Sequence, residues 1–262
     1  MIKPNIDILV PVHNQPMFAI KCVQSLRQQS RLNRILVMDD GSDEETQEAL
    51  KNLDDVTVYR NVGAEGFVRS NNRLAKKSDA PYILFLNSDT EALPHAIEYM
   101  AQNLDDGAAV CGALLIYPQN HPYPQWRGRV QHAGVQFEVS GYPIHFCAQR
   151  IATAPAVQKW RSINAVTGAC LMIKREVWDK IGGFDPKFGT GVFEDVSLCL
   201  SVKRLGLEVV YEPKAVLTHF EHASQTQADN WFSQQNLERN FSYLCAKHGV
   251  QQCDDDLYYR IR

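Results

Sequence analysis

Four short apolar segments in the first third of the chain constrain its fold more than any other feature. Each is apolar along its length and bounded by turn residues, which is typical of strands buried in a parallel sheet. Segments with helical features lie between or after them, opened by Pro16, by Ser42, near Val68 and by Pro94. This alternation predicts an α/β fold, with a Rossmann-like, mostly parallel central sheet flanked by helices. The four strand segments are Ile6–Val12, Ile35–Met38, Val56–Tyr59 and Tyr82–Leu86.

The second of these helices has a specific start signal. Ser42 is followed three residues later by Glu45, which is the spacing of a capping box. We therefore expect a helix that begins at Ser42 and buries Leu50 and Leu53. The third helix is expected over 68–77.

Polar side chains follow each strand segment. Because parallel sheets bind ligands beyond the carboxyl ends of their strands, these are the first candidates for chemistry. They are His13 and Asn14, Asp39 and Asp40, Asn61, and Asn87 and Asp89.

The second half of the chain is less regular. The stretch from Tyr117 to about Trp160 shows no clear period, and its aromatic residues, with His132, are candidates for an acceptor cleft or for core packing. Strands are then expected at 165–173, 208–211 and 216–220, and helices at 175–181, 194–205 and 230–248. No linker interrupts the chain, so we expect one domain over 1–262. A nucleotide-binding half would cover about 1–116, an acceptor and catalytic half about 117–250, and a tail 251–262.

Composition narrows the function classes. A net charge of −3 argues against nucleic acid as a partner. No apolar run reaches the roughly 18 residues that span a bilayer, so we expect at most peripheral membrane contact. The seven cysteines lack paired CxxC spacing and are expected to be reduced, which favours the cytoplasm.

Three acidic motifs are candidates for chemistry, and each has an ordinary structural alternative. Asp39-Asp40-Gly41-Ser42 is either a turn with a helix cap or a carboxylate that accepts from a ribose or a base. Asn87-Ser88-Asp89 is either a turn or a set of oxygen ligands for a divalent cation, to which His219 could add an imidazole. Asp195 is either a first-turn acid that favours the helix dipole or a general base.

In order along the chain, these pieces closely resemble the family 2 glycosyltransferases, particularly bacterial members that make O-antigen, rhamnan and other cell-surface polysaccharides. The matching pieces are Val10 to Asn14, Asp39 to Ser42, Gly66-Phe67 with Asn71-Asn72, Phe85 to Thr90, Gln131 to Gly134, Thr167 to Leu171, Gly183 to Asp185, Phe193 to Asp195, and His219 to Ser224.

The resemblance implies a GT-A fold and an inverting transfer from a UDP-, dTDP- or GDP-sugar to a glycan or lipid-linked glycan, with Mg²⁺ or Mn²⁺ as cofactor. It implies that Asp195 is the catalytic base and that Asp89 and His219 hold the metal. Glu194, Gly168 and His132 would support the acceptor side. The nucleotide-sugar residues would be Pro11, Asn14, Asp40, Asn72, Asn87 and Ser88.

Two residues depart from the family pattern. Asn87 replaces the first acid of the metal motif, which weakens the expected metal requirement. Ser197 stands where relatives commonly carry another acid. Any role that this acid has in orienting the acceptor is therefore not expected to carry over to this chain.

Two other classes remain open at this stage. A sugar nucleotidyltransferase would also bind a nucleotide at the strand ends, whereas the missing GxGxxG and P-loop argue against a dehydrogenase or an NTPase. A degenerate domain of a larger synthase would bind glycan or a partner without turnover.

Overall fold

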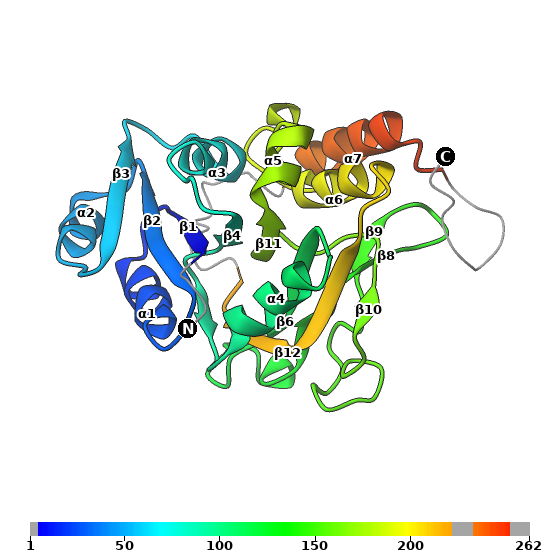
Figure 1. Cartoon of the computed structure of the whole chain (residues 1–262), viewed down its shortest axis with the longest axis horizontal. Helices are drawn as coiled ribbons and strands as arrows, with labels where there is room; N and C mark the ends of the chain where they lie inside the picture. Colours follow the sequence, from blue (N-terminus) through cyan, green and yellow to red (C-terminus); the bar gives the residue numbers. More distant parts are fainter. Residues whose placement is uncertain (1–4, 222–232, 252–262) are drawn as a thin grey trace.

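A mixed sheet occupies the middle of the molecule (Figure 1). The computed structural model describes residues 5–221 and 233–251, and ten strands within them join in this sheet. Its path runs β10-β12-β6-β11-β4-β1-β2-β3, with β5 paired to β12 and β7 to β6. The strands are β1 Ile6–Val12, β2 Leu32–Asp40, β3 Val56–Asn61, β4 Tyr82–Leu86, β5 Thr90–Ala92, β6 Val110–Ile116, β7 Val130–His132, β10 Arg161–Ser162, β11 Cys170–Lys174 and β12 Val209–His219, while β8 Val135–Phe137 and β9 Pro143–His145 form a separate hairpin.

The four strands expected from the sequence form the parallel part of the sheet. β1 lies between β2 and β4, and β3 extends the sheet beyond β2, all in parallel. β11 then pairs antiparallel with both β4 and β6, and β12 runs parallel to β6. The predicted α/β class with a largely parallel centre is confirmed.

Helices cover both faces of this sheet (Figure 1). The apolar residues of β1 alternate: Ile8 and Val10 pack in one core with α1, α2 and α4, while Leu9 packs in the other with α3, α5, α6 and α7. The helices are α1 Pro16–Leu26, α2 Glu44–Lys51, α3 Phe67–Ala75, α4 Ala96–Asp105, α5 Arg175–Ile181, α6 Glu194–Arg204 and α7 Gln234–His248, with short 3₁₀ helices η1 Pro124–Trp126 and η2 Pro186–Phe188.

The expected capping box at Ser42 is wrong. The N-cap of α2 is Asp43, whose side chain accepts from the Thr46 N–H, and the helix starts at Glu44. Ser42 Oγ instead accepts from the Asn14 N–H at 2.9 Å. Asp43, the residue next to Ser42, therefore takes the N-cap position of α2.

Two boundaries in the second half also differ from expectation. The segments at 208–211 and 216–220 are one strand, β12, whose pairing with β6 shifts register between Glu212 and Val216. Helix α7 is described from Gln234, and the expected start at Asn230 lies outside the described residues. The irregular stretch from Tyr117 holds η1, β7, β8 and β9.

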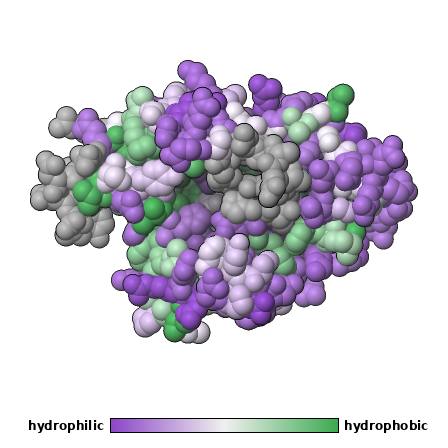
Figure 2. Space-filling model, turned by 180° about the vertical axis from the view of Figure 1, so that it is seen from behind, coloured by the Kyte–Doolittle hydropathy of each residue, from purple (hydrophilic) through white to green (hydrophobic). Residues whose placement is uncertain are grey.

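The face of the molecule drawn in Figure 2 is largely hydrophilic, and its hydrophobic residues form small, separate groups. In the part of the chain that the structure describes, no helix has the length and hydropathy needed to cross a membrane.

Candidate active site

A cavity of about 490 Å³ opens where β1, β2 and β4 end. Nine of the twelve site residues implied by the family resemblance line it, and they come from both halves of the chain; His13, a strand-end candidate, lines it as well. The nine are Pro11, Asp40, Asn87, Ser88, Asp89, Gly168, Glu194, Asp195 and His219.

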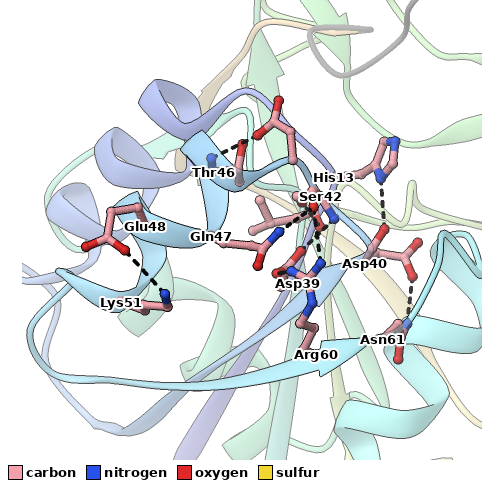
Figure 3. Close-up of polar contacts among 12 residues, drawn as sticks. His13, Asp39, Asp40, Ser42, Thr46, Gln47, Glu48, Lys51, Arg60 and Asn61 are labelled. Carbon is pink, nitrogen blue, oxygen red and sulfur yellow. Dashed lines mark hydrogen bonds and ion pairs between the residues drawn. The ribbon is translucent and has the colours of Figure 1, made fainter.

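The Asp40 carboxylate is fully engaged in internal hydrogen bonds. Its Oδ1 accepts from Asn61 Nδ2 at 2.6 Å and from the Glu65 N–H at 2.9 Å, and its Oδ2 accepts from the Gly66 N–H at 2.8 Å. His13 Nδ1 donates to the Asp40 carbonyl at 2.8 Å (Figure 3). Asp40 therefore shapes the wall of the cavity by fixing the loop between β3 and α3.

Asp39 faces away from this cavity. It accepts from the Ser42 N–H at 2.9 Å and pairs with Arg60 (Figure 3). Of the two adjacent carboxylates, Asp40 is the one among the cavity-lining residues.

Asn14 and Asn72 lie outside the described lining of the cavity, and both brace loops. Asn14 Oδ1 accepts from the Asp43 N–H at 2.9 Å, ahead of α2. The Asn72 amide donates to the Phe184 carbonyl at 2.8 Å and accepts from the Phe184 N–H at 3.0 Å. Asn14 thus holds the segment that follows β2, and Asn72 holds the loop between α5 and η2.

Strand pairing brings Asp89 and His219 together. Thr90 of β5 pairs with His219 of β12, so the preceding Asp89 reaches the imidazole, with Oδ1 3.1 Å from Nε2. The Asn87 amide nitrogen lies 3.4 Å from the same Nε2. Burial lowers the pKa of His219, but the charge and hydrogen bond of Asp89 outweigh it and leave the pKa raised.

Gln131, which sequence reasoning did not single out, fixes the orientation of His219. Its Oε1 lies 2.6 Å from His219 Nδ1, and a carbonyl oxygen can only accept, so Nδ1 carries a proton. Nε2 therefore faces Asp89 and the cavity. A partner of this kind is the usual support for a metal-binding histidine.

The residues present fit a divalent cation that takes part of its ligands from the protein and the rest from a phosphate and water. Within residues 5–221 and 233–251, no group of three or more His, Cys, Asp or Glu side chains could hold a metal ion. Asp89 and His219 offer a partial set, with the side-chain amide of Asn87 beside them. Mg²⁺-type sites commonly combine one or two carboxylates with substrate phosphates and water.

Asp195 lines the same cavity from a different element, the start of α6. Its Oδ2 accepts from the Gly168 N–H and its Oδ1 from the Val196 N–H, both at 2.7 Å. Burial raises the pKa of Asp195, and these two N–H donors oppose the rise. Burial and the neighbouring Asp195 charge raise the pKa of Glu194 well above its usual value. Asp195 is thus the more acidic member of the pair.

The turn that precedes these acids has an unusual backbone. Val192 and Phe193 have φ values of 77° and 69°, in the left-handed region. Such residues cost about 1–3 kcal/mol each and persist where the surroundings enforce them, often at functional sites.

His132 supports Asp195 from outside the cavity. It is fully buried, its Nδ1 donates to the Ala113 carbonyl at 3.1 Å, and its Nε2 accepts from the Thr167 N–H at 3.1 Å. Because Nε2 accepts from an N–H, the ring is neutral, and burial keeps the pKa of His132 well below its usual value. It holds the residue next to Gly168, which in turn donates to Asp195.

Another residue that lines the cavity, His145, was not predicted from the sequence, whereas Tyr142 was among the expected aromatic candidates. His145 Nδ1 donates to the Gln131 carbonyl at 3.0 Å, and burial lowers the pKa of the His145 ring. Among the aromatic candidates for the acceptor cleft in the stretch from Tyr117 to Trp160, Tyr142 lines the cavity. Tyr123 and Trp126 pack on each other and are not among the lining residues. The sequence signal for Gln131 was its place in the Gln131 to Gly134 motif.

Ser197 points away from the active-site cavity. Its Oγ lies 2.8 Å from His248 Nε2 of α7 and borders a separate small cavity of about 200 Å³. In this chain, position 197 therefore acts in helix packing between α6 and α7.

Parallel strands that end on a cavity shared with a later helix N-terminus form the arrangement of the GT-A glycosyltransferases. Solved structures of this class confirm the fold. GalNAc-T7 with UDP, GalNAc and Mn²⁺ superposes with a TM-score of 0.72 at 16% identity, over 92% of this chain and 48% of that one. Mannosyltransferase PcManGT of Pyrobaculum calidifontis, with GDP-Man and Mn²⁺, gives 0.58 at 13% identity, over 93% and 70%.

The chain belongs to glycosyl transferase family 2, whose sequence model matches residues 7–182. It is a glycosyltransferase domain. It is 31% identical over 249 residues to the O-antigen biosynthesis protein RfbC of Myxococcus xanthus, covering 88% of this chain and 19% of that protein. It is 27% identical over 268 residues to the uncharacterized protein y4gI of Sinorhizobium fredii, covering 97% and 29%. The O-antigen chain rhamnosyltransferase RfbN of Salmonella typhimurium is 23% identical, over 82% and 66%. The chain thus spans less than a third of the length of RfbC and of y4gI.

Proposed function

We propose that this domain transfers a sugar, with inversion, from a nucleoside diphosphate sugar to a hydroxyl of a growing cell-surface glycan. One observation carries the proposal: the Asp195 carboxylate and the Asp89–His219 pair line the same cavity. The relatives RfbC and RfbN, both named for O-antigen synthesis, support the acceptor class.

Asp195 acts as the general base. Its two backbone N–H donors hold the carboxylate against Gly168, so that it can take the proton of an acceptor hydroxyl as that oxygen attacks the anomeric carbon. One displacement inverts the configuration. A Mg²⁺ or Mn²⁺ ion held by Asp89 and His219, with Asn87 beside them, would compensate the charge that builds on the diphosphate leaving group.

The remaining predicted residues take supporting roles in this proposal. Pro11, Asp40 and Ser88 form part of the wall around the nucleotide, and Asn14 and Asn72 brace the adjacent loops. Glu194 lines the cavity beside Asp195, and its buried Oε2 has no hydrogen-bond partner among the described residues, so it is available to a sugar hydroxyl. His132 and Gly168 keep Asp195 in place.

We also propose that the acceptor is a glycan or a lipid-linked glycan and that the enzyme works in the cytoplasm, with at most peripheral membrane contact. The six cysteines within the described residues are free thiols, which supports a reducing compartment.

A thermal-shift screen tests the donor class. Purified protein is melted with UDP-, dTDP- and GDP-sugars, each with Mn²⁺, with Mg²⁺ or with EDTA. A ligand at 100 times its Kd adds about 2.7 kcal/mol of stability. We expect one nucleotide series to stabilise the protein only when metal is present, and the Asp89→Ala variant to lose that response.

Product analysis separates the alternatives. A glycosyltransferase releases a nucleoside diphosphate from the sugar nucleotide, whereas a nucleotidyltransferase consumes a nucleoside triphosphate and a sugar phosphate. Binding of the sugar nucleotide without any turnover, in the presence of glycan acceptors, would favour the degenerate domain.

A further inference from the structure

The turn that leads into α6 is held by a side chain from the far end of the chain. This turn, residues 188–193, contains Gly189, Gly191, Val192 and Phe193 with φ values of 67°, 149°, 77° and 69°. A β-branched residue and an aromatic residue rarely adopt such values without enforcement from their surroundings. Asp195 follows two residues after Phe193, so the path of the turn fixes where the carboxylate points.

Asn240 of α7 supplies that enforcement. Its side chain is 1% exposed, and its Nδ2 lies 3.0, 2.7 and 3.2 Å from the carbonyl oxygens of Phe188, Gly191 and Val192. One amide group therefore collects three backbone carbonyls from both ends of the turn. Such a buried amide is costly to remove, because the Gly191 and Val192 carbonyls would lose its hydrogen bonds, while the Phe188 carbonyl would keep only its bond from the Gly191 N–H.

A second set of contacts distinguishes Asn240 from its neighbours on the same helix. Tyr243 Oη and Lys247 Nζ both bind Asp185 Oδ2, at 2.8 and 2.7 Å. Those two residues fasten α7 to the loop before η2. The rings of Tyr243 and Phe241 also contact this turn, on Phe188 and Phe193. Within the described part of α7, Asn240 is the residue whose side chain hydrogen-bonds the backbone of the turn leading to Asp195.

We propose that Asn240 is a positioning residue for the transfer step. By fixing the left-handed turn, it holds Asp195 at the cavity in contact with Gly168, and it makes α7 part of the active-site scaffold although the helix lies outside the matched family segment. The inference rests on the proposed function, because it takes Asp195 as the base.

The test compares Asn240→Asp and Asn240→Leu with Tyr243→Phe as the matched control. Asn240→Asp keeps the shape and removes the N–H donors, and Asn240→Leu does so without adding charge beside the carbonyls. Tyr243→Phe removes one hydrogen bond from the same helix and leaves the turn contacts in place. Turnover is measured as release of nucleoside diphosphate from whichever UDP-, dTDP- or GDP-sugar stabilises the wild-type protein most. Hydrogen–deuterium exchange is followed over residues 183–196.

We expect both Asn240 variants to lower kcat by about 100-fold while the donor KM stays within about twofold, as befits a small misplacement of a reacting group. Amides at 188–196 should exchange faster. In Tyr243→Phe, kcat should stay near wild type and the faster exchange should be confined to 183–187.

Other outcomes overturn the inference in distinguishable ways. If the Asn240→Leu variant folds and keeps wild-type kcat, Asn240 has only a structural role. A loss of kcat equal to that of Tyr243→Phe would assign the effect to general loosening of α7. If Asp195→Asn itself retains full transfer, the base assignment fails first, whatever Asn240 does.

Discussion

The two sides of the active-site cavity are built on different principles. On the strand-end side, Asp40 and His219 are the last residues of β2 and β12, and Asp89 directly precedes β5. The pairing of β5 with β12 brings Asp89 to His219. On the turn side, Gly168 and Asp195 meet through irregular backbone with left-handed residues, held by side chains of distant elements. Under the proposed function, the strand-end side would bind the donor, and the turn side, with its left-handed backbone, would hold the base for the chemical step.

The largest expected effect is on the turn side. Asp195→Asn keeps the size of the side chain and removes the basic oxygen, so transfer should fall by about 10² to 10⁴-fold, the usual contribution of general base catalysis. Donor binding, measured by calorimetry with Mn²⁺, should be nearly unchanged. A purely capping Asp195 would instead cost about 0.5–2 kcal/mol of stability and leave the rate intact. That result would move the search for a base to Glu194.

The next effect belongs to the strand-end side. Asp89→Ala and His219→Ala should each weaken Mn²⁺-dependent donor binding by at least about 100-fold, above the 10 to 100-fold typical of outer-shell partners of a metal. Affinity for the nucleotide in EDTA should change far less in either variant. Loss of binding in Asp89→Ala alone would show that His219 is a structural neighbour of the site.

The strand-end side of the cavity could be predicted from strand positions in the sequence, whereas the contacts that hold the turn side could not. Asp40, Asn87 and Asp89 could be placed at the cavity because parallel strands deliver the residues that follow them to one edge. Asp195 came from a motif, and the structure adds why it is held: Gly168 and Val196 N–H groups bind it.

The residues that sequence reasoning did not assign act through tertiary contacts with no local signal. Gln131 reaches His219 across 88 positions, and Asn240 reaches Val192 across 48.

Asn14 and Asn72 were expected to line the nucleotide pocket, but their amides bind loop backbone, a pairing that no periodicity reveals. The N-cap of α2 was missed by one residue, because Asp43 caps the helix in place of Ser42.

A smaller effect is expected at Asp40. Removing its carboxylate in Asp40→Ala leaves three donors without their acceptor, and one hydrogen bond to a charged group is worth about 1.5–3 kcal/mol. Stability should fall by at least that amount, and nucleotide affinity by about 10-fold. Asp43→Ala is the control, since it removes a helix cap outside the cavity and should lower stability alone. Equal nucleotide affinity in folded Asp40→Ala would take this loop out of the donor site.

The smallest effect lies behind the turn side, where His248 of α7 meets Ser197 of α6. Burial, with the charges of Arg204 and Lys247, lowers the pKa of His248 to about 4, while Asp185 opposes the shift. An unfolded histidine titrates near 6.5. Between these values the unfolded chain binds the proton more readily, so the stability from the neutral ring is complete above about pH 6.5 and is lost as the pH falls toward 4.

His248→Gln keeps a hydrogen-bonding group for Ser197 and removes this titration. The slope of unfolding free energy against pH should therefore be shallower in the variant between pH 6.5 and 4, by at most about 1.4 kcal/mol per pH unit for a single proton. His132 and His145, whose pKa values burial also lowers, remain in both proteins and cancel in the difference. Because His248 lies outside the described lining of the active-site cavity, kcat at pH 7.5 should not change. Denaturant titrations at half-unit pH intervals measure the two slopes. Parallel slopes would mean that the α6–α7 contact carries no pH dependence, whereas a changed kcat would mean that the turn side extends further into α7 than its contacts with Asn240.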